Sequence, residues 1–145
     1  LKDKQGIFPA MLDTTSVYRM IDMYVNGQKE NFNLNKVNDV FMKFYSDGRC
    51  AKFAIPVKDS LDNSNSLKED DFNPLKANKG YYYSINGKEV EIEDFVWGDV
   101  NGHYVILNYT FNSSGDTLIM QDKYVKLIYK KEPIPLSWNR YKVDW

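Results

Sequence analysis

Apolar and polar residues alternate with a period of two through most of this chain, and amphipathic helical spacing is nearly missing. A period of two is the signal of a β-strand with one covered face, whereas an amphipathic helix repeats every three to four residues. Val17, Ile21, Met23 and Val25 share one face of a first strand expected over residues 16–25. The pattern therefore predicts an all-β domain.

Turn signals divide this pattern into hairpins. Asn26-Gly27 suits a type I′ turn, which needs two positive φ angles, and should return the chain into a short strand over 29–34. Asp47-Gly48 and Asn86-Gly87 mark two further hairpins. Further strands are expected over residues 40–45, 51–55, 80–85, 89–93, 103–111, 117–120 and 124–129. Eight or nine sequential antiparallel strands curl and close, so we predict an up-and-down meander barrel.

The expected strand after Asn86-Gly87 is half-solvated, with Val90 and Ile92 facing inward. Its glutamates, Glu89, Glu91 and Glu93, then face outward. Asp94-Phe95-Val96 breaks this phase, which predicts a β-bulge at that point.

Three segments lie outside the regular pattern. Residues 1–15 are expected to form an N-terminal arm before a barrel domain over 16–132. Within that domain, 57–79 is a long polar loop in which a short helical turn is expected around Leu67 to Phe72, and long loops are often functional. Residues 133–145 form an aromatic extension that has to pack on the barrel or on a partner.

Composition and charge narrow the possible partners. The chain has 145 residues, which suits one domain, and its 43% hydrophobic and 15% aromatic content excludes disorder for most of the length. With 19 basic and 20 acidic residues the formal net charge is -1, so no bulk positive field favours nucleic acid. No apolar run approaches the roughly 18 residues of a membrane-spanning helix.

The stretch Gly80-Tyr-Tyr-Tyr-Ser-Ile-Asn-Gly-Lys-Glu-Val-Glu-Ile92, followed by Asp116-Thr-Leu-Ile-Met120 and Lys126-Leu-Ile-Tyr-Lys130, resembles the lipocalin-like domains of bacterial envelope lipoproteins. The likeness covers residues 80–130 best. It implies a small lipocalin-like β-barrel, exported to the periplasm or cell surface of a Gram-negative bacterium and lipid-anchored there. The chain begins at Leu1 without a leader, which is consistent with a removed export signal and a lipid anchor outside the sequence.

Residue types that carry catalysis or bind metals are sparse, and each has a simpler interpretation. The sole histidine, His103, is expected to be an exposed residue at a strand start, and the sole cysteine, Cys50, a small structural residue. Glu91 and Glu93 point outward, while Asp99 and Asn101 lack a complete calcium-loop spacing. We therefore predict no catalytic residue, metal or cofactor, and no enzyme.

Aromatic residues are the most conspicuous surplus. Tyr81, Tyr82 and Tyr83 are consecutive, so alternation places tyrosine on both faces of the sheet. The first hypothesis is a binding module for a small apolar or glycan ligand, with ligand contacts from Tyr82, Trp97, Tyr109 and Phe72 and with the 57–79 loop as a gate. Its barrel core would comprise Phe44, Phe53, Val90, Ile92, Leu107 and Tyr109.

The alternative hypothesis is a structural or assembly protein. In this case the barrel is packed solid, and the tail from Trp138 to Trp145 docks on an envelope protein partner. An apolar gap in the barrel favours the first hypothesis, and exposed tail tryptophans favour the second.

Overall fold

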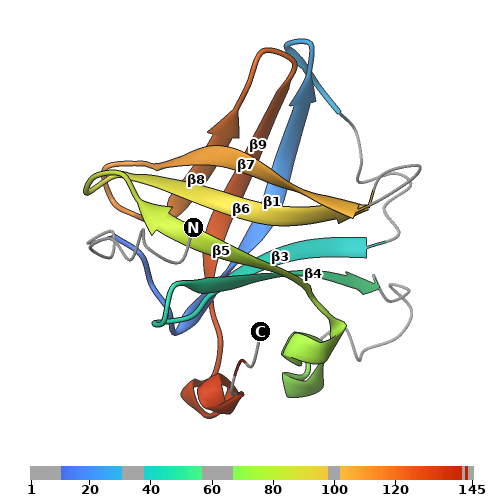
Figure 1. Cartoon of the computed structure of the whole chain (residues 1–145), viewed down its shortest axis with the longest axis vertical. Coiled ribbons are helices and arrows are strands. Elements are labelled where there is room, and N and C mark those ends of the chain that lie inside the picture. Colours follow the sequence, from blue (N-terminus) through green and yellow to red (C-terminus); the bar gives the residue numbers. More distant parts are fainter. Residues whose placement is uncertain (1–10, 31–37, 57–66, 98–101, 142, 144–145) are drawn as a thin grey trace.

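The computed structural model describes residues 11–30, 38–56, 67–97, 102–141 and 143, with the backbone alone for 95–97 (Figure 1). Its strands are β1 (Ser16–Val25), β2 (Gln28–Lys29), β3 (Asn38–Phe44), β4 (Arg49–Pro56), β5 (Asn78–Ser84), β6 (Glu89–Trp97), β7 (Gly102–Phe111), β8 (Thr117–Gln121) and β9 (Val125–Pro133). They form one antiparallel sheet in the order β2-β1-β3-β4-β5-β6-β7-β8-β9, and β1 also pairs with β9. That pairing closes eight strands into a barrel with β2 as an extra strand, which confirms the predicted fold.

The hairpin turns follow their sequence signals. Asn26 and Gly27 have φ angles of 51° and 78°, as a type I′ turn requires, and Gly48 has a φ of 89°. At the third turn the Asn86 Oδ1 accepts hydrogen bonds from the backbone N–H groups of Lys88 and Glu89, each at 2.9 Å. Of the strand expected over 29–34, only its start is seen in β2, because residues 31–37 lie outside the described part.

The prediction of a β-bulge at Asp94-Phe95-Val96 is wrong. β6 pairs with β7 in unbroken register from Glu89 opposite Thr110 to Trp97 opposite Gly102. The register shift lies in β1 instead, between Met20 and Asp22 opposite β9.

The bulge in β1 divides the apolar face that was predicted for this strand. Val17, before the bulge, packs on the outside of the barrel. Met23 and Val25, after it, pair with residues of β9 that pack on the inner core. Ile21 at the bulge is exposed, so the four residues predicted to share a face do not do so.

Two separate hydrophobic clusters stabilise the fold. The inner cluster lies inside the barrel and consists of Tyr18, Met42, Phe44, Cys50, Tyr82, Val90, Ile92, Tyr109, Phe111, Leu118, Met120 and Tyr129. The outer cluster covers the outside of β1, β3 and β4 and consists of Val17, Phe41, Ala51, Phe53, Ile55, Phe72 and Ile134. Leu107 packs on the inner cluster as predicted, but Phe53 belongs to the outer one, because both faces of β4 are covered.

The described part of the long loop supplies one layer of the outer cluster. It contains the 3-10 helices η1 (Glu69–Phe72) and η2 (Pro74–Lys76), which confirms the helical turn expected around Leu67 to Phe72. Phe72 packs edge-on against Phe41 and Phe53, with both ring-centroid distances at 5.4 Å. The loop ends earlier than expected, since β5 begins at Asn78, and residues 57–66 lie outside the described part.

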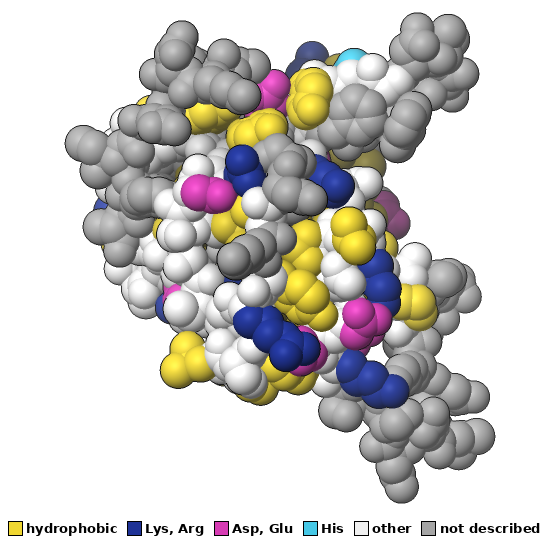
Figure 2. All heavy atoms as spheres, turned by 60° about the horizontal axis from the view of Figure 1, so that its bottom comes forward, with side chains coloured by type: hydrophobic (Ala, Val, Ile, Leu, Met, Phe, Trp, Pro, Cys, Tyr) yellow, Lys and Arg dark blue, Asp and Glu magenta, His cyan; other side chains and the backbone are white. Residues whose placement is uncertain are grey.

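The C-terminal segment supplies the other layer. β9 leads into the 3-10 helix η3 (Leu136–Arg140), where half-buried Trp138 packs on Phe72 with ring centroids 6.2 Å apart. Arg140 Nε lies 2.6 Å from Glu69 Oε1, which joins η3 to η1. Figure 1 shows η1 and η3 on the same side of the barrel, and Figure 2 shows apolar side chains running down the middle of the molecule's face on that side. The tail therefore packs at least Trp138 on its own barrel, while Trp145 lies outside the described residues.

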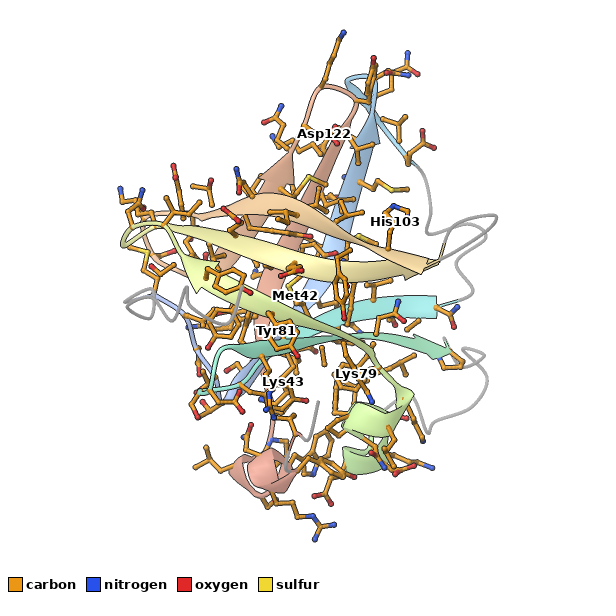
Figure 3. The ribbon with its side chains drawn as sticks, in the orientation of Figure 1. Met42, Lys43, Lys79, Tyr81, His103 and Asp122 are labelled. Atoms are coloured by element: carbon orange, nitrogen blue, oxygen red, sulfur yellow. The ribbon has the colours of Figure 1, made fainter. Side chains whose placement is uncertain are left out.

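A buried lysine ties the tail to the arm and to β3. Lys43 Nζ donates to the Thr14 carbonyl at 2.8 Å and to Asn139 Oδ1 at 2.7 Å, and it lies 5.6 Å from the centre of the Tyr45 ring. Figure 3 shows Lys43 on the side of the sheet that faces the tail. Burial lowers the pKa of Lys43 to about 8, and Asp13 offsets part of this effect.

Candidate functional site

The two ends of the barrel differ in how they are filled. At the end where hairpins β3–β4, β5–β6 and β7–β8 turn, Met11 and Leu12 of the arm pack on the inner cluster. Below them the Phe44 ring stacks edge-on against Tyr18 at 5.5 Å and Tyr82 at 5.1 Å. Aromatic rings and arm residues thus fill this end, which we call the plugged end.

The opposite end, called the rim, shows an inverted burial pattern. On β4 the outward-facing Phe53 and Ile55 are only 1% and 8% exposed, because the outer cluster covers them. Ala54 between them pairs with Val40, which packs on the inner cluster, so Ala54 faces inward, yet it is exposed. In a closed, filled barrel the inward residue would be the buried one. The inner surface at the rim is therefore accessible to solvent.

Two seams in the sheet account for this opening. In the described part, β1 and β3 pair only through Tyr18–Met42 and Arg19–Phe41, and β7 and β8 pair only over residues 109–111 and 118–120. Both contacts lie away from the rim. Figure 1 shows β1, β8 and β9 rising together away from β3–β7. The two groups of strands hence diverge toward the rim.

An ion pair lies inside the barrel in the rim half. Lys52 on β4 and Asp94 on β6 point inward, and Lys52 Nζ lies 2.5 Å from Asp94 Oδ2. Their side chains are 22% and 14% exposed, so solvent reaches the pair through the rim. Burial disfavours the charged amine, but the Asp94 carboxylate attracts it and accepts its hydrogen bond, and the pKa of Lys52 is raised above its ordinary value.

Two tyrosines lie beside this ion pair. The rings of Tyr109 on β7 and Tyr129 on β9 meet edge to face with centroids 6.1 Å apart, and both side chains are buried. The Tyr109 hydroxyl is buried near the Tyr129 hydroxyl, but it has no hydrogen-bond partner of good geometry. Burial raises the pKa of both phenols, so both stay neutral and protonated.

Apolar side chains surround the polar group. Met20, Val40, Leu107, Val125 and Leu127 pack on the inner cluster but are only partly buried. The buried Cys50 thiol lies below the ion pair, where burial raises its pKa, so it is not a ready nucleophile. We define the rim site as Lys52, Asp94, Tyr109 and Tyr129 together with these five apolar residues.

The structure separates the four residues predicted to contact a ligand. Tyr109 belongs to the rim site. Tyr82 is also inside the barrel, but at the plugged end, where its hydroxyl donates to the Tyr45 carbonyl at 2.5 Å. Phe72 lies in the outer cluster, away from the barrel interior, and the side chain of Trp97 lies outside the described residues.

Sequence reasoning missed Lys52 and Asp94, although a signal for each was present. The Asp47-Gly48 hairpin places Lys52 opposite Met42, which shares the inward face of β3 with Phe44. Asp94 continues the inward phase of Val90 and Ile92 once no bulge intervenes. Hairpin register would therefore have placed both charges inside the barrel.

Other residues singled out in the sequence have ordinary surroundings. His103 is exposed at the start of β7, as expected (Figure 3). Glu93 faces outward as predicted but is buried, and it accepts a hydrogen bond from Tyr83 Oη at 3.2 Å. Within the described residues no group of three or more His, Cys, Asp or Glu side chains is arranged to hold a metal ion, while Asp99 and Asn101 lie outside them.

No family model, curated protein or solved structure matches this chain. None of the helices in the described ranges has the length and apolar character needed to cross a membrane.

Proposed function

We propose that this protein is a non-catalytic binding module that takes a small, largely apolar molecule into the rim half of its barrel. The observation that carries the proposal is the inverted burial on β4, where inward-facing Ala54 is exposed between covered Phe53 and Ile55. Binding sites in barrels are commonly at such an open end, with apolar walls and a few convergent polar groups. The rim site has this composition.

An apolar ligand fits the rim site better than a glycan. Sugars are held by stacking on aromatic faces together with several hydrogen bonds, whereas the rim walls are aliphatic side chains of Met, Val and Leu. The hydroxyl of the outward-facing Tyr83 donates to Glu93 and is not free for a sugar. Trp138, which the assembly hypothesis assigned to a partner, packs on Phe72.

A dye titration tests the proposal. Nile red, an uncharged apolar dye that fluoresces in apolar surroundings, is titrated with the wild type and with Ala54→Trp, which places an indole in the rim. We expect binding by the wild type and at least about tenfold weaker binding by Ala54→Trp. Thr110→Trp, at an exposed position of β7, is the matched control and should bind like the wild type. Absence of wild-type binding, or equal binding by all three proteins, would refute the proposal.

The cellular location is part of the same proposal. The resemblance of residues 80–130 to lipocalin-like domains of envelope lipoproteins supports a periplasmic or cell-surface module, tethered by a lipid anchor outside this sequence. Fractionation of the source cells tests it, with recovery in the envelope fraction expected and recovery in the cytosol contrary to it.

A further inference from the structure

Part of one strand has a neighbour on one side only. β7 runs from Gly102 to Phe111, but β8 pairs with it only over residues 109–111. Among the described residues, no strand lies beside residues 102–107 on the side of β7 away from β6. Figure 1 shows β8, β9 and β1 rising away from β7. Residues 102–107, which we call the open edge, are therefore positioned to pair with a further strand.

The hydrogen-bond pattern shows which backbone groups lie along the open edge. The Phe111 N–H donates to the Lys88 carbonyl at 2.8 Å, in continuation of the register between β6 and β7. Successive residues of a strand direct their backbone groups to opposite sides, so those of Val105 and Leu107 also point toward β6. The N–H and C=O of Ile106 then point away from β6. A strand that approaches the open edge can bond to both groups.

The side chains of the open edge also favour contact with another protein surface. Tyr104 and Ile106 project to the outside of the barrel and are 53% and 50% exposed. The stretch from Gly102 to Leu107 contains no Lys, Arg, Asp, Glu or Pro, and its pairing with β6 has no bulge. Natural sheets use charges, prolines and bulges to prevent edge-to-edge pairing. The open edge has none of these features.

Other incompletely paired edges of the sheet do carry such protection. β2 is only two residues long and contains Lys29, whose Nζ lies 2.9 Å from Asp22 Oδ1. β3 carries Asp39 beside its short pairing with β1, and Arg19 lies 3.4 Å from that carboxylate. β4 ends at Pro56, beyond its pairing with β5. The open edge of β7 differs from these edges because it is long enough to pair and carries no charge.

We propose that two copies of this chain associate through their open edges, with β7 of one copy antiparallel to β7 of the second. A twofold axis brings like residues together, so a charge in the paired stretch would meet a like charge, and this stretch has none. With the axis at Val105, Tyr104 of one copy lies opposite Ile106 of the second copy. Both exposed apolar side chains then gain a cross-strand partner, and the Ile106 backbone groups bond across the interface. This association goes beyond ligand binding and does not depend on it.

Sedimentation velocity over a concentration series from about 1 µM to about 500 µM tests the association. We expect a monomer–dimer equilibrium in the wild type. Ile106→Lys should raise the dimer dissociation constant at least about tenfold, because it brings two ammonium groups to the interface. Ile85→Lys is the matched control, since Ile85 is 48% exposed but lies in the β5–β6 turn at the plugged end, and it should dimerise like the wild type. A monomeric wild type at every concentration, or equal dimerisation of all three proteins, overturns the proposal.

Amide hydrogen exchange followed by NMR locates the interface. The Ile106 N–H points away from β6, whereas the Val105 N–H points toward it. Between the lowest and the highest concentration we expect exchange at Ile106 to slow at least about threefold, with exchange at Val105 unchanged. If the protein dimerises without slower exchange at Ile106, the interface lies elsewhere and the pairing of β7 with its copy is wrong.

Discussion

Lys52 Nζ and Asp94 Oδ2 meet at 2.5 Å inside the barrel although their strands, β4 and β6, are not neighbours in the sheet. The strand between them is β5, where Gly80 stands opposite both Cys50 and Asp94. Lys52 itself pairs with Asn78, so the two charged groups approach each other diagonally across β5. Because Gly80 has no side chain, none projects from the β5 position beside Asp94.

Removing one member of the pair should destabilise the fold more than removing both. Lys52→Met leaves an uncompensated, partly buried carboxylate and should lower the free energy of unfolding by about 1 to 3 kcal/mol. Lys52→Met/Asp94→Leu replaces the pair by apolar groups and should recover most of that loss. Urea unfolding of both singles and the double variant measures the coupling. Additive losses in the double variant would show that the two charges do not interact.

Gly80 should tolerate no larger side chain. A Cβ there would lie 2.4 Å from the Glu93 carbonyl oxygen and 3.3 Å from Cys50 Sγ, and the first neighbour is backbone that moves little. We expect Gly80→Ala to cost about 1 to 3 kcal/mol in urea unfolding. Gly87→Ala is the control, since nothing lies within 4 Å of its Cβ position, and it should be close to neutral. If the two variants are equally stable, a backbone shift relieves the close approach at Gly80 at little cost in unfolding free energy.

Phe72 should matter for stability and not for ligand binding. It is buried in the outer cluster against Phe41, Phe53 and Trp138. Phe72→Ala should therefore cost about 3 to 5 kcal/mol of unfolding free energy. At a temperature where the variant is folded, its Nile red affinity should match the wild type. Loss of dye binding in the folded variant would instead favour the sequence prediction that Phe72 contacts the ligand.

Lys43 should make stability rise with pH in the mildly alkaline range. Its pKa is lowered to about 8 in the folded protein, while a lysine in the unfolded chain titrates near 10.4. Between these values the unfolded chain binds more protons, so raising the pH favours the folded state. We expect the stability of the wild type relative to Lys43→Met to increase by about 1 to 3 kcal/mol between pH 7.5 and 10.

The comparison with Lys43→Met removes contributions shared by both proteins, including those of the tyrosines. The variant also lacks the hydrogen bonds of Lys43 to the Thr14 carbonyl and Asn139, which lowers its stability, but it has no titrating group at position 43, so the pH-dependent part of the difference comes from Lys43. Urea unfolding at several pH values gives the difference directly. A difference that stays flat, or falls, from pH 7.5 to 10 would contradict a lowered pKa for Lys43.

The strand order was predictable because turn residues and period-two alternation are local signals. Asn26-Gly27 and Asp47-Gly48 specify tight hairpins through their backbone preferences, and β1 has the predicted bounds. The position of the bulge was not predictable in this way. Asp94 looks like a break in an apolar phase, whereas it is an inward charge whose partner, Lys52, comes from another strand.

The assignment of faces failed where a strand is covered on both sides. Phe53 on β4 is as apolar as an inner core residue, but the residues that cover it, Phe72 and Ile134, come from distant segments. Local periodicity contains no information about such cover. The register of the β3–β4 hairpin would have given the correct faces. Phe44 pairs with Cys50 and Met42 pairs with Lys52, so Cys50 and Lys52 share the inward face of β4 whatever their hydrophobicity.

The most direct test of ligand entry through the rim is NMR of the methionine methyl groups during titration with decanamide. Met20 packs in the rim half and Met120 lies beside Tyr109, whereas Met11 covers the plugged end. We expect saturable shifts of the Met20 and Met120 methyl signals with little change at Met11. Shifts confined to Met11, or no shift at any methionine at saturating decanamide, would contradict a ligand site in the rim half of the barrel.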